Sequence, residues 1–308
     1  MPSGERIFVQ AIRRYCARHG IAIDVRADGW LIEMRREGTR RFAFGYEIGL
    51  NSAVAHRLAN DKSATAEVLA LSGVPCIPHQ LFLDPRMGEH IAGSGWREAM
   101  LALLAQNPQG LVVKPNEGTA GRSVFKVTSR AELERAIGEV FSTSPSLAIA
   151  PYVEIEDEVR VILLDETPMV VYGKKRPSVV GDGLQTLREL ASAVPKARLG
   201  NLDERRLSAI VPKGERRFLT WRHNLDAGTE PVLIEDGEVR SACAKLAIDA
   251  ARAIGITFAS IDLVRVDASW QVLEINSGVM METLGKRYPE IVQATYDAAL
   301  DRVFALAR

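Results

Sequence analysis

The stretch of sequence that decides the fold is ASIDLVRVDASWQVLEINSGVMM, residues Ala259–Met281. It reads as two short strands, Ser260–Val266 and Gln271–Asn276, joined by the polar turn Asp267-Ala268-Ser269. Because side chains alternate along a strand, such a hairpin has two faces of different chemistry. We therefore expect one face to build core and the other to carry function.

A turn centred on Ala268 places Asp262 opposite Glu274, with Asn276 on the same side of the pleat. Carboxylate and amide oxygens are ligands that suit Mg²⁺ better than zinc. The hairpin therefore predicts a magnesium site, against the alternative that these acids are merely solvated. A register slip of one residue would move Asp262 off this face. The opposite face is apolar and consists of Ile261, Leu263, Leu273 and Ile275.

Composition narrows the class of protein. The chain has 308 residues, of which 47% are hydrophobic and 25% charged, as in a globular protein with a core. Lys plus Arg and Asp plus Glu number 39 each, so we expect no nucleic-acid or membrane partner and only a local anion site. The N-terminal MPSGERIFVQ lacks the apolar segment of a signal peptide. Three scattered cysteines without a CxxC pair indicate reduced thiols, and we expect a cytoplasmic protein.

The first part of the chain predicts a small α/β unit that ends near Leu50. A helix is expected over residues 5–18, followed by strands over 21–25, 30–34 and 39–44. Further on, Asp61 is expected to cap a helix whose first residue is Lys62. A first-turn lysine opposes the helix dipole, so its ammonium group is expected either to reach an anion or to stay in solvent.

A strand that ends in Lys114-Pro115 leads into a loop, residues 116–122, and a returning strand, residues 123–127. The glycines of such a loop let backbone N–H groups wrap around phosphates, and Lys114 would add a positive charge. An ordinary hairpin loop is the alternative. A P-loop is excluded because GxxxxGK[ST] is absent and the segment returns as a strand.

Two later segments add candidate contacts. Around Tyr152-Val153, Pro151 removes one donor and leaves neighbouring backbone groups to meet a purine edge. Four acids follow within five positions, up to Glu158, so at least one is expected to have a partner such as a ribose hydroxyl or a metal. A solvated acidic loop is the alternative.

In this order, the motifs resemble the ATP-grasp ligases, most of all the cyanophycin synthetase and bifunctional glutathione synthetase branch, over about residues 51–308. The motifs that carry the resemblance are Asn60-Asp61-Lys62, Lys114-Pro115 with its glycine loop, Tyr152-Val153 with Glu158-Val159-Arg160, Lys175-Arg176-Pro177 with Val180-Gly181-Asp182-Gly183 and Thr186, Arg222-His223-Asn224-Leu225, Asp262, and Glu274-Ile275-Asn276.

The resemblance implies an α+β, ATP-grasp fold in which two α+β subdomains clamp ATP, behind a short N-terminal α/β unit, residues 1–50. The lid subdomain would span about residues 93–150 and the large subdomain residues 151–308. The implied reaction transfers the γ-phosphate of ATP to a small carboxylate. An amine then attacks the acyl phosphate, which yields an amide, ADP and phosphate. Two Mg²⁺ ions, or Mn²⁺, would assist.

The resemblance also assigns roles to individual residues. ATP would be held by Lys62, Lys114, Glu117, Gly118, Gly121, Ser123, Tyr152, Val153 and Glu158, and metal by Asp262, Glu274 and Asn276. The residues expected to stabilise the transferring phosphoryl group or the substrate carboxylate are Arg160, Lys175, Arg222 and Asn224.

Three departures from the family pattern stand out. Ser123 replaces a second close glycine, and Ala150 or Pro151 replaces an acid before the adenine hinge. Ser277–Glu282 replaces a Pro-Gly turn, so Glu282 is a hypothesis for contacting a cationic amine, against a plain helix-start residue. Two alternative functions remain open, a ring-closing ligase and a nucleotide-binding regulator without turnover. The sequence is also compatible with a homodimer.

Overall fold

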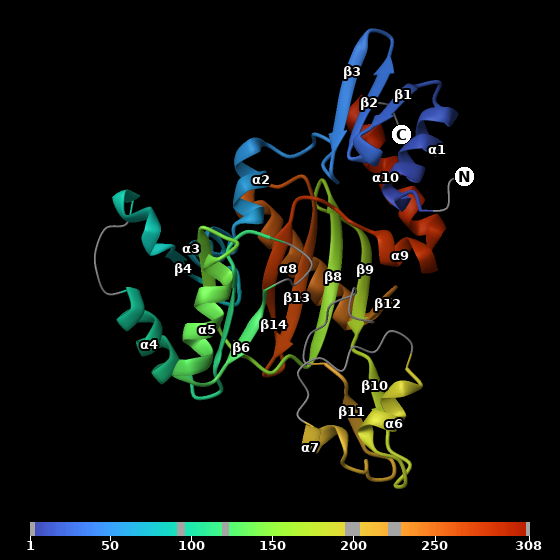
Figure 1. The fold of residues 1–308 in the computed structure, drawn as a ribbon. Coiled ribbons are helices and arrows are strands. Elements are labelled where there is room, and N and C mark those ends of the chain that lie inside the picture. The colour runs from blue at the N-terminus through green and yellow to red at the C-terminus, as the bar shows by residue number, and fades with distance from the viewer. Residues whose placement is uncertain (1–3, 91–95, 119–122, 195–203, 221–228, 306–308) are drawn as a thin grey trace.

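A computed structural model describes residues 4–90, 96–118, 123–194, 204–220 and 229–305, and every structural statement concerns these residues (Figure 1). Their helices are α1 (Ile7–Arg18), η1 (Ala27–Gly29), α2 (Ala53–Asn60), α3 (Lys62–Leu71), η2 (Pro85–His90), α4 (Trp96–Gln106), α5 (Arg130–Phe141), α6 (Leu187–Ser192), α7 (Glu204–Leu207), α8 (Gly237–Ile254), α9 (Glu282–Arg287) and α10 (Pro289–Phe304).

The strands are β1 (Ala22–Arg26), β2 (Leu31–Arg36), β3 (Thr39–Phe44), β4 (Gln80–Leu83), β5 (Leu111–Pro115), β6 (Phe125–Val127), β7 (Ser146–Pro151), β8 (Asp157–Leu164), β9 (Thr167–Lys175), β10 (Ser178–Val180), β11 (Arg216–Phe218), β12 (Glu230–Leu233), β13 (Phe258–Val266) and β14 (Ser269–Asn276). Two antiparallel sheets dominate, one of five strands in the order β12-β9-β8-β13-β14 and one of four in the order β4-β7-β5-β6 (Figure 1).

In the hairpin of β13 and β14, Asp262 lies opposite Glu274 as predicted, but the turn length and the register between the turn and this pair differ from the prediction. The turn has two residues, Asp267 and Ala268, because β14 begins at Ser269. A bulge between Asp262 and Leu263 restores the expected register. The predicted apolar face was therefore wrong at one position: Val272 packs with Ile261, Leu263 and Ile275, whereas Leu273 packs with Val264 and Val266.

The five-stranded sheet buries both faces, and side-chain alternation assigns each face to a different core. On one face, Val159, Val161 and Leu163 of β8 pack with α8 and α3. On the other face, Ile162 and Leu164 pack with the first 50 residues and α10. These apolar residues lie near one end of that second face, and buried polar residues near its other end form the site.

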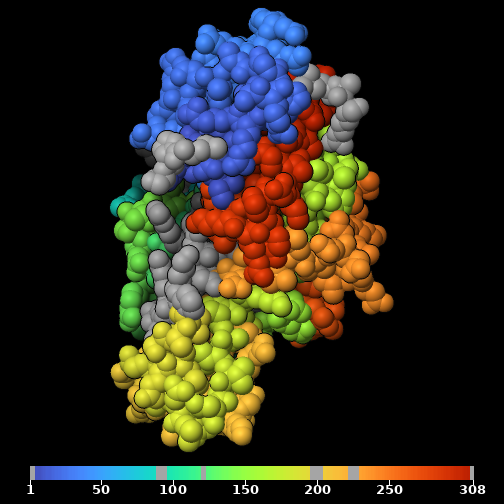
Figure 2. All heavy atoms as spheres, turned by 90° about the vertical axis from the view of Figure 1, so that its right-hand side faces the viewer, coloured from blue at the N-terminus to red at the C-terminus, as the bar shows by residue number. Residues whose placement is uncertain are grey.

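The four-stranded sheet has its own core, which α4 and α5 cover. A small module of β10, β11, α6 and α7 has another, and it projects from the body of the molecule (Figures 1 and 2). The chain crosses from one large sheet to the other between β7 and β8. Ile77 and its neighbours join them at the edge of β14, where the N–H of Ile77 donates to the oxygen of Val272 over 2.9 Å.

Most helix ends lie where capping residues and glycines in the sequence predict them. Asp61 caps α3 by accepting from the N–H of Ala64, and Ser129 and Thr186 open α5 and α6 with full capping boxes. Gly255 ends α8 in the left-handed conformation, at φ 72°. The sequence analysis did not anticipate α2, which ends directly before Asp61.

All three cysteines are free. Among the described helices, none is both long and apolar enough to cross a membrane.

Candidate functional site

A buried ion cluster lies near one end of the five-stranded sheet. Asp262 on β13 lies opposite Arg160 on β8 and is 1% exposed. The Arg160 guanidinium donates to both carboxylate oxygens, with Nε–Oδ1 and Nη2–Oδ2 distances of 2.6 Å. Lys174 on β9 lies with its Nζ 2.9 Å from Oδ1 of Asp262 and also contacts Glu158. Two acids and two cations thus share one buried patch.

The cations determine the protonation of this patch. Burial by itself raises the pKa of Asp262, but Arg160 and Lys174 outweigh burial and hold that pKa below its ordinary range. For Glu158 burial dominates and raises the pKa to about 7, although Lys174 acts in the opposite direction. Asp262 is therefore the permanent negative charge, and Glu158 can exchange a proton near neutral pH.

Lys174 was missed by the sequence analysis, which chose Lys175. Alternation along β9 places Val170, Tyr172 and Lys174 on the buried side, and Lys175 is exposed. The sequence alone did not distinguish the two lysines, because Val171 on the opposite face of β9 is as buried as Val170 and Tyr172. Tyr172 lies opposite Arg160, and its buried hydroxyl lies beside the Arg160 guanidinium.

The four-stranded sheet supplies a second group of cations. Lys114 on β5 is 7% exposed, and its pKa is lowered to about 8, mainly by burial and also by Lys62, against the opposing effect of Glu274 and Glu158. Glu274 and Glu158 stand on the five-stranded sheet, so Lys114 lies where the two sheets approach one another. The Lys62 ammonium donates to the oxygen of Gly118 over 2.9 Å. Both predicted phosphate lysines therefore adjoin the start of the glycine loop.

Backbone contacts hold this loop to α3. Asp61 and Glu117 form an isolated bridge, and the N–H of Ser63 donates to Oδ1 of Asn116 over 3.1 Å. Ser123 has a φ of 50°, the left-handed region that glycine favours, which is consistent with the glycine that the family pattern has there. Gly121, Arg222 and Asn224 lie outside the described residues.

Some of the groups predicted to contact adenine already form hydrogen bonds within the protein. The N–H of Tyr152 donates to the oxygen of Gly110 over 2.9 Å, so it is not open to a base. The Tyr152 hydroxyl donates to Glu154 over 2.8 Å, and the Lys126 ammonium lies 3.2 Å from the ring centroid. Val153 packs against the apolar cluster that contains Val264.

The predicted metal ligands are neighbours. Nδ2 of Asn276 lies 3.4 Å from Oε1 of Glu274, and Glu274 lies across the hairpin from Asp262. In the described part of the chain, no group of three or more His, Cys, Asp or Glu forms a metal cluster. Glu274 and Asn276 offer oxygens that fit a hard cation, whereas both oxygens of Asp262 contact Arg160 or Lys174.

Glu282 has a structural role in addition to the predicted one. Its two oxygens accept from the N–H of Ile7 over 2.7 Å and of Phe8 over 3.1 Å, which caps the start of α1. Tyr46 donates to the same carboxylate. The hypothesis that Glu282 contacts an amine stays a prediction, and the carboxylate already has three hydrogen-bond partners within the protein.

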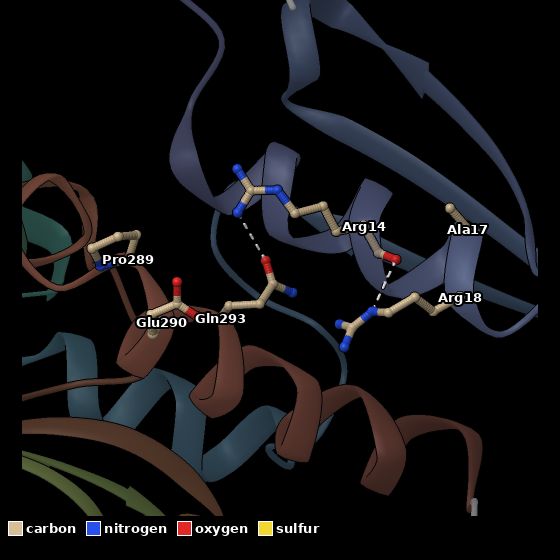
Figure 3. A pocket seen from close by; sticks show the side chains of 6 residues that line it. All are labelled: Arg14, Ala17, Arg18, Pro289, Glu290 and Gln293. Carbon is tan, nitrogen blue, oxygen red and sulfur yellow. Dashed lines mark hydrogen bonds between the residues drawn. The ribbon is translucent and has the colours of Figure 1, made fainter.

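A hollow between α1 and α10 is the other concave feature near the N-terminal unit (Figure 3). Nη1 of Arg14 donates to Oε1 of Gln293 across it over 3.2 Å. None of the predicted site residues lines this hollow, so it is separate from the ion cluster.

Comparison with known proteins agrees with this geometry. A family model described as a RimK-like ATP-grasp domain matches residues 213–294, which include all three predicted metal ligands. The chain has the ATP-grasp fold. Cyanophycin synthetase from Trichormus variabilis is 28% identical over 250 residues, which make up 73% of this chain and 26% of that protein. The ATP-grasp chain thus spans about a quarter of the length of this curated relative.

Two solved structures show the same fold at low identity. A bifunctional glutathione synthetase from Pasteurella multocida has a TM-score of 0.55 at 17% identity, covering 91% of this chain and 41% of its own. D-alanine–D-alanine ligase from Bacillus anthracis, complexed with ATP, has a TM-score of 0.53 at 16% identity, covering 83% and 68%. The predicted resemblance to ATP-grasp ligases and the predicted ATP-grasp fold are confirmed.

Proposed function

We propose that this protein is an ATP- and Mg²⁺-dependent ligase that joins a small carboxylate to an amine, with amino-acid-like molecules as substrates. The observation that carries the proposal is the meeting of cations from two subdomains. Lys62 and Lys114 approach from the side of the four-stranded sheet, and Arg160 and Lys174 stand on the five-stranded sheet.

Phosphoryl transfer to a carboxylate needs neutralised charge and in-line positioning more than it needs an acid or base. Lys62 and Lys114 would neutralise the triphosphate, and Arg160 would steady the substrate carboxylate or the transferring group. Glu274 and Asn276, with Asp262, would hold Mg²⁺, which supplies charge stabilisation when bound. The lid loop would keep water from the acyl phosphate.

Glu274→Ala tests the metal assignment. We expect a loss of at least 100-fold in ADP formation with ATP, Mg²⁺ and pooled amino acids, and an unchanged circular dichroism spectrum. The fold should survive because Glu274 is only partly buried. The matched control is Glu67→Ala, which removes an exposed acid from α3. Retained activity in Glu274→Ala would contradict the assignment.

The same assay separates three functions. ADP release that depends on both a carboxylate and an amine supports ligation. Release with one compound alone indicates ring closure, and nucleotide binding without release indicates a regulator.

A further inference from the structure

A hydrogen-bonded polar cluster lies directly beside the predicted metal strand. Nδ1 of His56 is 3.1 Å from Oε1 of Glu47 and 2.9 Å from Oγ of Ser277. Nε2 of the same ring is 3.2 Å from Nδ2 of Asn60. Ser277 is the residue after Asn276, so this cluster adjoins the proposed metal site without belonging to it.

Three separate elements build the cluster. His56 and Asn60 stand one turn apart on α2, so both side chains lie on one face of that helix. Glu47 follows β3 and is held by an isolated bridge to Phe44. Ser277 is 1% exposed, whereas the side chains of His56 and Glu47 are 41% and 26% exposed. A molecule in solvent can therefore reach the imidazole and the carboxylate.

The segment after Asn276 brings Glu47 close to the site. A Cβ placed on Gly278 would lie 3.8 Å from Oε1 of Glu47 and 3.5 Å from Cβ of Tyr46. Because Gly278 has no side chain, its backbone lies close to the Glu47 carboxylate. Oε2 of Glu47 has no hydrogen-bond partner among the residues that the structure describes.

The charges around the site differ from one side to the other. Four cations, Lys62, Lys114, Arg160 and Lys174, gather where phosphate and carboxylate groups would lie. On the side of the N-terminal unit, the carboxylate of Glu282 is already committed to α1. Glu47 also lies beside the segment after Asn276, and its side chain is 26% exposed to solvent.

We propose that Glu47, positioned by His56, binds the ammonium group of the acceptor amine. This inference rests on the proposed ligase function and deepens it, because it specifies an amine that is positively charged when it binds. A charged hydrogen bond to Glu47 would hold the amine beside the segment that follows Asn276. The ammonium would release its proton to solvent water, the neutral nitrogen would then attack the acyl carbon, and phosphate would leave. His56 acts as a positioning residue, since its Nδ1 fixes the carboxylate.

Glu47→Gln tests this inference with the amine that the substrate screen identifies. The amide keeps the shape of the side chain but removes the negative charge. We expect the KM for the amine to rise at least tenfold, while the KM for ATP changes less than twofold. An unchanged amine KM, or an equal rise in both constants, would overturn the inference.

Hydroxylamine provides a second measurement, because it is uncharged at neutral pH and traps acyl phosphates as hydroxamates. With both nucleophiles present, Glu47→Gln should raise the ratio of hydroxamate to amide at least tenfold over wild type. A ratio equal to that of wild type would count against a role for Glu47 in binding a cation.

Glu282→Gln is the matched control. It weakens the cap of α1 and should lower the thermal midpoint without changing the amine KM. The reverse pattern, with Glu282→Gln and not Glu47→Gln raising the amine KM, would overturn the inference. If the wild-type protein forms no ADP in response to carboxylate and amine, the proposed function fails; if it does and Glu47→Gln matches it, only this inference fails.

Discussion

At the scale of single residues, the site shows a conflict between stability and function at Lys114. Its ammonium group is buried, and its pKa falls from the ordinary 10.5 to about 8. Between these values the unfolded chain holds a proton that the folded chain has released, so stability rises with pH across this range. Below pH 8 Lys114 is protonated in both the folded and the unfolded chain, and burial of its charge lowers the free energy of unfolding by about 3 kcal/mol.

Lys114→Met should therefore stabilise the protein at pH 7 and abolish ATP binding. We expect the free energy of unfolding to rise by about 1–3 kcal/mol, since methionine keeps most of the length without the charge. Urea denaturation and calorimetric titration with ATP measure the two effects. Lys286→Met, on an exposed position of α9, should change neither. A less stable Lys114→Met variant would show that Glu274 and Glu158 more than offset burial.

At the scale of elements, the hairpin of β13 and β14 depends on a strained turn. Asp267 and Ala268 both have positive φ, 47° and 61°, as a two-residue hairpin turn requires. An L-residue in this region costs about 1–2 kcal/mol, which glycine avoids at an entropic cost of about 0.5–1 kcal/mol. The turn is retained because the bulge and the Asp262–Glu274 pair depend on its length.

Ala268→Gly should raise the free energy of unfolding by about 0.5 kcal/mol, measured by urea denaturation. The same substitution at Ala70, exposed in α3, should lower it by about 1 kcal/mol because helices disfavour glycine. Equal effects of the two substitutions would contradict the positive φ at the turn.

At the scale of the whole molecule, the first 50 residues and the C-terminal helix form one core. Phe8 of α1 is 1% exposed, and its ring centroid lies 5.3 Å from that of Tyr296 on α10. The Tyr15 hydroxyl donates to Asp301 over 2.9 Å. The N-terminal unit is thus joined through its core to the end of the chain, and Glu47 is carried into place by this packing.

Phe8→Ala should destabilise the protein by about 3–5 kcal/mol. Hydrogen exchange should show lost protection in both α1 and α10, because they share a core, and retained protection in α5, whose core is separate. Lost protection confined to α1 would mean that the two helices unfold independently.

The sequence by itself determined what depends on local chemistry. The pairing of Asp262 with Glu274, the cap at Asp61 and the stop at Gly255 all follow from strand alternation, capping and glycine conformation. Such signals act between near neighbours, so they can be read without knowing the fold.

Only the tertiary structure decided what depends on segments far apart in the chain. It brings the backbone of Ile7 onto Glu282, and Glu47 with His56 onto Ser277. Which of two adjacent lysines faces Asp262 also depends on the sheet, because a strand has an inside only once other elements cover it. Contacts of this kind arise from packing, which no local pattern encodes.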